Sequence, residues 1–92
     1  MNFQEIKKEE IVNLHFNTKD VLLNNEHIKA RNQKLINTSI LGNIEKGKCK
    51  IFFQAKEGYN YVETTIWAVT DKYVCLKGGV TLLVASIFDV IL

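Results

Sequence analysis

The spacing of apolar residues changes near residues 42–47 of this chain. Before that point apolar residues recur every three or four positions, which is typical of amphipathic helices. After it they alternate with polar residues, which is typical of strands with one buried face. The sequence therefore predicts a single α+β domain over residues 1–92, with a helical part in 1–45 and an antiparallel β part in 46–92.

Two helices are predicted in the first half. The first begins after a candidate cap at Asn2 and ends near "HFN", and its apolar positions include Phe3, Ile6, Ile11 and Leu14. The second has Asn17 or Thr18 as its candidate cap and Gly42 as its candidate stop. Its predicted buried stripe consists of Val21, Leu22, Ile28, Leu35, Ile36 and Ile40.

Four strands are predicted in the second half. They are "KCKIFFQAK", "YVETTIWAVT", "YVCLK" and "VTLLVAS", and the turns between them are "EGYN", "DK" and "GG". Turns this short join antiparallel neighbours, so the strands follow an up-and-down order. The fold class is thus two N-terminal helices packed on a four- to five-stranded, strongly curved antiparallel sheet, or a small barrel.

The register of the first two strands divides their side chains between two faces. If the first turn holds two or four residues, Cys49, Ile51, Phe53 and Ala55 share the core face with Val62, Thr64, Ile66 and Ala68. The opposite face then gathers Lys48, Lys50, Phe52, Lys56, Tyr61, Glu63, Thr65 and Trp67. The third and fourth strands are apolar on both faces.

The glycine pair in "LKGGV" invites comparison with a phosphate-binding loop. Such a loop places a lysine and a hydroxyl after its glycines and then begins a helix. Here Lys77 precedes Gly78 and Gly79, and a strand follows. The pair is instead what a two-residue hairpin needs, because both central residues of such a turn have φ > 0.

Composition and charge narrow the function classes only slightly. The 92 residues are 47% hydrophobic and 24% charged, which is ordinary for a globular protein. The net charge is +2, and the excess lies around Lys46, Lys48, Lys50 and Lys56. It neither demands nor excludes a polyanionic partner. The N-terminus has no continuous apolar segment of the secretory type, and residues 80–92 are too short to span a membrane, so we expect a cytoplasmic protein without membrane contact.

Candidate chemistry is sparse. Cys49 and Cys75 lack the CxxC spacing, and neither His15 nor His27 has ligands at metal-binding spacing. Ser86 precedes Asp89 by three residues, as in a helix-capping box and not as a nucleophile with its base. We therefore expect no catalytic residue, metal or cofactor.

Two surfaces are candidates for binding. Lysines beside aromatic residues can hold single-stranded nucleic acid, but the alternative in which the helices cover these aromatics and the lysines lie at the rim is favoured. This first candidate comprises Lys48, Lys50, Phe52, Lys56, Tyr61 and Trp67. The second is a self-association surface, expected because the last strands carry more apolar residues than a small monomer can cover. It comprises Val74, Leu76, Leu83, Ile91 and Leu92.

The second half of the chain also carries a resemblance. "VETTIWAVT" followed by "VCLKGGV" resembles the core of a group of small bacterial proteins with no assigned activity. More distantly, two strands, the glycine hairpin, another strand and a short "ASIFDV" segment resemble Sm-like and SH3-like small barrels. That resemblance implies a barrel closed by "ASIFDV" and binding of RNA or peptides by oligomers. The expected function is a small non-catalytic interaction module that self-associates or binds a protein, with RNA or single-stranded DNA binding as the alternative.

Overall fold

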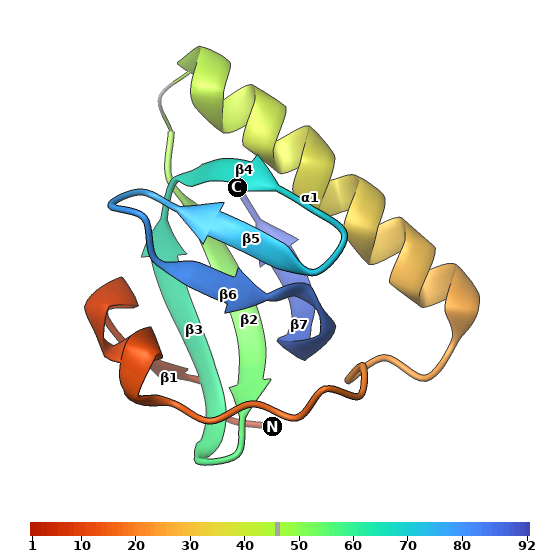
Figure 1. Ribbon diagram of the computed structural model, residues 1–92. Coiled ribbons are helices and arrows are strands. Elements are labelled where there is room, and N and C mark those ends of the chain that lie inside the picture. Colours follow the sequence, from red (N-terminus) through yellow and green to blue (C-terminus); the bar gives the residue numbers. More distant parts are fainter. Residues whose placement is uncertain (46) are drawn as a thin grey trace.

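Two β-sheets face each other, with one long helix along one side (Figure 1). The computed structural model describes the backbone of residues 1–45 and 47–92 and the side chains of residues 1–42 and 47–92, so Lys46 lies outside the described residues. The four-stranded sheet has the order β1 (Gln4–Glu5), β3 (Gly58–Thr64), β2 (Cys49–Ala55) and β7 (Ile87–Ile91). The three-stranded sheet has the order β4 (Ile66–Val69), β5 (Tyr73–Leu76) and β6 (Thr81–Leu83). The helices are α1 (Asn25–Glu45) and the short 3-10 helices η1 (Lys8–Asn13) and η2 (Val84–Ser86).

The predicted register of the first hairpin is confirmed. Ile51 pairs with Val62 and Cys49 with Thr64, so these side chains share the core face. Lys50 and Phe52 point to the other side, where Phe52 pairs with Tyr61. The turn is shorter than "EGYN", because the strands already pair at Ala55 and Gly58.

The predicted second strand is wrong as a single element. The chain leaves the four-stranded sheet at Thr65 and enters the three-stranded one at Ile66. Two hydrogen bonds fix this corner: the Thr65 hydroxyl donates to the Gly47 carbonyl over 3.2 Å, and the Lys77 amide donates to the Thr65 carbonyl over 2.9 Å. One segment therefore supplies strands to both sheets.

The predicted curved single sheet or closed barrel is also wrong. β7 does pair with β2, as a closing segment would, but the strands form two separate sheets that do not join into a barrel. On one side α1 packs against both β4 and β7, the edge strands of the two sheets. A helix therefore lies where a barrel would need strand pairing.

The predicted first helix is absent from residues 1–24, all of which the structure describes. That segment instead packs irregularly, placing Ile11 in the core and Ile6, Leu14 and Phe16 against it. Three backbone hydrogen bonds tie it to β3, to the β2–β3 turn and to η2: the Ile6 amide donates to the Tyr61 carbonyl, the Lys56 amide to the His15 carbonyl and the Val21 amide to the Ala85 carbonyl. The apolar residues spaced three to four apart in this segment therefore anchor it to the core and do not form one side of a helix.

α1 begins later than predicted and continues past its predicted stop. Asn24 is its cap, since the Asn24 Oδ1 accepts hydrogen bonds from the amides of Glu26 (2.8 Å) and His27 (3.3 Å). Gly42 does not end the helix. It lies buried inside it, where an added Cβ would meet the Gly47 carbonyl oxygen at 3.5 Å.

The inward side of α1 is largely polar. Arg31, Thr38 and Ser39 are buried there together with Leu35, whereas Ile36 and Ile40, predicted to be buried, are 42% and 53% exposed. The hydrophobic core itself lies between the two sheets. It consists of Ile11, Leu35, Cys49, Ile51, Phe53, Val62, Ile66, Val74, Leu76, Leu82, Val84, Ile87 and Val90.

The hairpin at the glycine pair is confirmed, but the predicted two-residue turn is wrong, because the loop between Leu76 and Val80 holds three residues. Gly78 and Gly79 have φ values of 90° and 88° in the turn between β5 and β6. The Leu76 amide donates to the Val80 carbonyl over 2.7 Å, which leaves Lys77 in the loop with the two glycines.

Candidate interaction surface

The predicted lysine and aromatic surface is divided between two sheets. Lys50, Phe52 and Tyr61 do lie together on the outer side of the four-stranded sheet. Lys48 precedes that strand, and Lys56 lies beyond its other end. Trp67 belongs to β4 of the other sheet and is 51% exposed. The six residues therefore do not form one surface.

The outer side of the four-stranded sheet carries a cluster of five aromatic rings, here called the aromatic face. Phe3 is its hub, with ring centroids 5.3 Å from Phe52, 5.7 Å from Tyr59 and 5.8 Å from Phe88, all edge-to-face. The Phe52 and Tyr61 rings lie 5.3 Å apart. The rings bury one another in pairs of the kind that stabilises proteins, so this cluster acts as a second, smaller core that anchors the N-terminal residues.

Charges of both signs surround the aromatic face. The Lys50 Nζ lies 5.7 Å from the centroid of the Tyr61 ring, and Lys50 pairs across the strands with Glu63. Glu5 pairs with Tyr61, and Asp89 accepts a hydrogen bond from Lys34 over 2.8 Å. Three carboxylates therefore lie close to these lysines, and the aromatic face carries no excess of positive charge.

The predicted self-association residues separate in the structure. The prediction that Val74 and Leu76 lie on the surface is wrong, because both are fully buried between the sheets. Leu83 is half-buried on the outer side of β6, opposite Tyr73. Ile91 and Leu92 are exposed, and Ile91 pairs with Lys50 on the four-stranded sheet.

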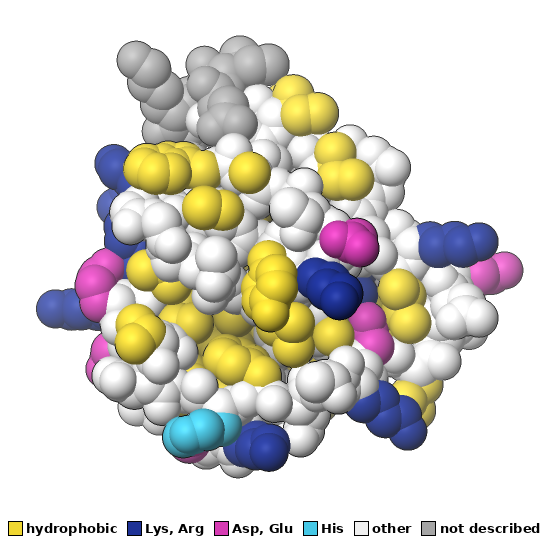
Figure 2. Space-filling view, in the orientation of Figure 1, with side chains coloured by type: hydrophobic (Ala, Val, Ile, Leu, Met, Phe, Trp, Pro, Cys, Tyr) yellow, Lys and Arg dark blue, Asp and Glu magenta, His cyan; other side chains and the backbone are white. Residues whose placement is uncertain are grey.

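The outer side of the three-stranded sheet is apolar, and the sequence did not single it out. A β-bulge at Trp67 turns both Trp67 and Ala68 outward, where Ala68 pairs with Cys75. Figure 2 shows hydrophobic side chains exposed over these strands and the adjoining side of α1. We call this surface the front face, defined by Trp67, Ala68, Tyr73, Cys75 and Leu83 together with Ile36 and Ile40 of α1.

α1 extends the front face because it runs antiparallel to β4. Ile36 and Val69 line one cavity, while an added Cβ on Gly42 would lie 3.9 Å from the Thr65 methyl group. Ile40 lies on α1 between Ile36, which is beside Val69, and Gly42, which is beside Thr65, so it lies beside the start of β4. Trp67 and Tyr73, 51% and 47% exposed, are therefore flanked by exposed aliphatic side chains.

A groove lies at one end of the front face, between α1 and the turn that joins β4 to β5. It consists of two neighbouring cavities of about 430 and 300 Å³ that share Asn32, Asp71 and Val84 in their walls. Ile28 and Tyr73 line the larger cavity, and Ile36 and Val69 the smaller. Its walls are mainly apolar, with Asp71 and Lys72 as the charged groups on the turn.

The arginine in this groove is not available to a ligand. The Arg31 Nη atoms donate to both carboxylate oxygens of Asp20 (2.7 Å each), and Nη1 also donates to the Ile87 carbonyl (3.0 Å). Nη2 and Nε both donate to the Asn32 Oδ1. All five guanidinium protons have partners, so Arg31 joins the helix, the N-terminal segment and β7 and cannot bind an anion as well.

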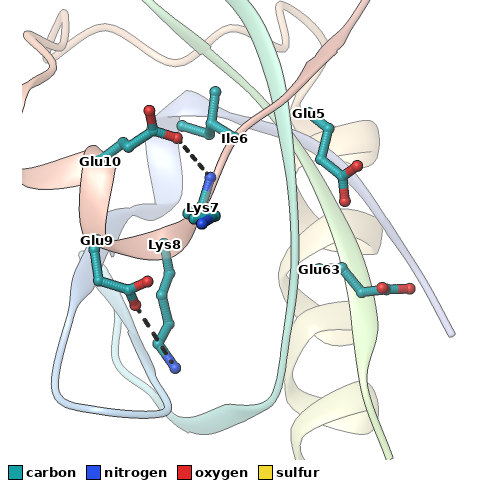
Figure 3. Close-up of a pocket in the computed structure, with 7 residues that line it drawn as sticks. All are labelled: Glu5, Ile6, Lys7, Lys8, Glu9, Glu10 and Glu63. Atoms are coloured by element: carbon teal, nitrogen blue, oxygen red, sulfur yellow. Dashed lines mark hydrogen bonds and ion pairs between the residues drawn. The ribbon is translucent and has the colours of Figure 1, made fainter.

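A third cavity, of about 490 Å³, lies beside η1 and contains several charged groups (Figure 3). The Lys7 amide donates to the Glu10 carboxylate (2.8 Å), and the Lys8 ammonium lies 3.9 Å from the Glu9 carboxylate. Glu5 and Glu63 lie on the other side of β3 and do not turn toward these groups. In the part of the chain that the structure describes, no group of three or more His, Cys, Asp or Glu side chains is placed to hold a metal ion.

His15, Ser86 and Cys49 have structural environments. The His15 Nδ1 lies 2.6 Å from the Glu57 carboxylate, which joins the N-terminal segment to the β2–β3 turn. The hydrogen bond from His15 lowers the pKa of Glu57. Ser86 is buried, and its hydroxyl donates to the Leu83 carbonyl over 2.6 Å. Burial raises the pKa of the Cys49 thiol to about 11.

Comparison with protein-family models, curated proteins and solved structures finds no match to this chain. Among the described residues, no helix is both long and apolar enough to cross a membrane.

Proposed function

We propose that this protein is a non-catalytic interaction module that self-associates through its front face. The observation that carries the proposal is that Trp67 and Tyr73 are about half exposed on an open sheet face whose other members are apolar. Aromatic residues are enriched at the centres of protein interfaces, where charged residues are depleted. Exposed apolar surface of this kind on a small domain favours a protein partner.

A second copy of the chain is the partner that suits this surface. In a two-fold symmetric dimer the same patch meets itself, so the patch must be self-complementary. The five strand residues of the front face carry no formal charge, and none of them would meet a like charge across the symmetry axis. Burial of Trp67, Tyr73, Ile36 and Ile40 against the second copy would remove much of the exposed apolar surface on this side.

Sedimentation of the wild-type protein and two variants tests this proposal. Ala68→Glu places a charge in the middle of the front face and, because Ala68 is exposed, leaves the core intact. Leu23→Glu is the matched control, since Leu23 is 88% exposed and lies outside the front face. We expect dimers for wild type and Leu23→Glu at micromolar concentration and monomers for Ala68→Glu. A monomeric wild type at tens of micromolar would overturn the proposal.

Nucleic-acid binding is the second candidate, and Lys50 beside Tyr61 is the observation that favours it. Exposed aromatics next to lysines can stack on bases and contact phosphates. The aromatic face supports this function less well, because its rings pack on one another and Glu5, Glu63 and Asp89 share the surface. Binding to a short single strand that weakens with salt by a log–log slope of about −0.7 per phosphate contact, and that is lost in Lys50→Ala, would favour this function instead.

A further inference from the structure

We infer that in the dimer each copy inserts Trp67 into the groove between α1 and the β4–β5 turn of the other copy. This inference rests on the self-association proposed above. The contact between Trp67 and the groove would fix how the two copies are oriented, which an apolar face alone does not do.

The positions of Trp67 and the groove within the front face carry this inference. Trp67 lies near the start of β4, while the groove is lined by Val69 at its end and by Thr70 and Asp71 of the following turn. The three residues from Trp67 to Thr70 span about 10 Å of extended chain, so Trp67 and the groove lie at opposite ends of β4. A two-fold axis between them, near the Ala68 and Cys75 pair, would bring each Trp67 onto the partner's groove.

The shape and chemistry of the groove suit an indole ring. Ile36, Val69 and Val84 give the smaller cavity apolar walls, and its volume of about 300 Å³ is at the lower end of the range for ligand pockets. A buried indole also needs an acceptor for its N–H group. Asp71 lines both cavities and offers a carboxylate at the exposed turn.

Trp67 cannot occupy the groove of its own chain. The bulge directs its side chain outward from the sheet, and the hairpin holds Trp67 and Asp71 at opposite ends of β4. Any energetic coupling between these two residues therefore has to pass between two copies. This separation makes a double-mutant cycle on dimerisation informative.

Trp67 fluorescence supplies the first test, since Trp67 is the single tryptophan of the chain. We expect its emission to shift to shorter wavelength, and its quenching by acrylamide to fall, as the concentration rises through the dimer transition seen in sedimentation. A dimer whose Trp67 emission and quenching match those of the monomer would overturn this inference and leave the proposed self-association standing. A wild type that stays monomeric would overturn both.

The double-mutant cycle supplies the second test. Trp67→Phe keeps an aromatic ring but removes the N–H donor, and Asp71→Ala removes the acceptor. Each variant should raise the dimer Kd by about 10-fold or more, as expected for a hydrogen bond to a charged group, and the double variant should be no weaker than the weaker single one. Additive effects, with circular dichroism confirming folded variants, would overturn the Trp67–Asp71 contact.

Discussion

Arg31 holds Asp20 through two hydrogen bonds of 2.7 Å between its Nη atoms and the carboxylate oxygens. The Arg31 side chain is only 3% exposed and that of Asp20 is 22% exposed. The pair connects α1 to the N-terminal segment, and the bond from Arg31 to the Ile87 carbonyl adds the start of β7. A polar contact therefore attaches α1 to the rest of the fold, whereas the sequence predicted that an apolar stripe would attach it.

Removing Arg31 should destabilise the fold. Arg31→Met leaves the Asp20 carboxylate and the Ile87 carbonyl without their donor, and we expect a loss of about 2 to 4 kcal/mol in the free energy of unfolding. Lys34→Met is the control, because Lys34 forms a 2.8 Å pair with Asp89 in which both side chains are about half exposed. Its loss should be under about 1 kcal/mol. Equal urea midpoints for the two variants would contradict the role assigned to Arg31.

Acid should weaken the same contact. Burial by itself raises the pKa of Asp20, but the hydrogen bonds from Arg31 and the Leu22 amide and the Arg31 charge together lower it below its ordinary value of 3.8. A lowered pKa in the folded state means that the stabilisation is complete above 3.8 and is lost as pH falls through the folded value. The urea midpoint of wild type should therefore decrease as the pH is lowered below 3.8.

Asp20→Asn tests whether Asp20 is responsible for that acid sensitivity. The variant should be less stable than wild type at neutral pH, and its urea midpoint should depend less on pH in the acid range. The pKa of Glu57 is also lowered from its ordinary value of 4.5, mainly by its hydrogen bond with the His15 side chain, so Glu57 contributes an acid response of the same sign. Glu57→Gln is therefore measured alongside, and an acid response abolished by Glu57→Gln alone would contradict the assignment to Asp20.

The sequence predicted the β2–β3 hairpin more accurately than it predicted β4. The register of β2 and β3 followed from alternation, because Cys49, Ile51 and Phe53 all face the core and a tight turn fixes the pairing. In β4 the same rule placed Ala68 inside with Ile66. The bulge at Trp67 changes the alternation, so Ile66 is buried and Ala68 is exposed. A bulge depends on packing between sheets, and a short sequence pattern does not reveal it.

The helical half was less predictable for a related reason. Regular spacing identified Ile6, Ile11 and Leu14 as core-facing residues, but a short 3-10 turn and extended segments place them there without an α-helix. On α1 the buried side depends on Arg31, whose burial is favourable only because Asp20 arrives from another segment. The front face was missed because its residues come from a bulge in β4, from β5 and β6, and from a helix whose buried side is largely polar.

Gly79 should not tolerate a β-branched side chain. Its φ of 88° is unfavourable for such residues, although no atom lies within 4 Å of an added Cβ, so the cost comes from the backbone and not from crowding. Gly79→Val should lower the free energy of unfolding by about 1 kcal/mol or more. Gly79→Asn, which accepts positive φ more readily, should cost less. Equal urea midpoints for the two variants would contradict the turn geometry.

The two cysteines should report on self-association because they differ in environment. Cys49 is buried with a pKa of about 11, whereas Cys75 is half-buried in the middle of the front face. Thiol reactivity follows access and thiolate content, so one thiol should react with a disulfide reagent in the native protein and two in denaturant. If the front face is the dimer interface, the rate at Cys75 should fall as the protein concentration rises through the dimer transition. Ala68→Glu should keep the rate at its dilute value, and Cys75→Ser should abolish the native reaction. A Cys75 rate that does not change across that transition would place the interface elsewhere on the molecule.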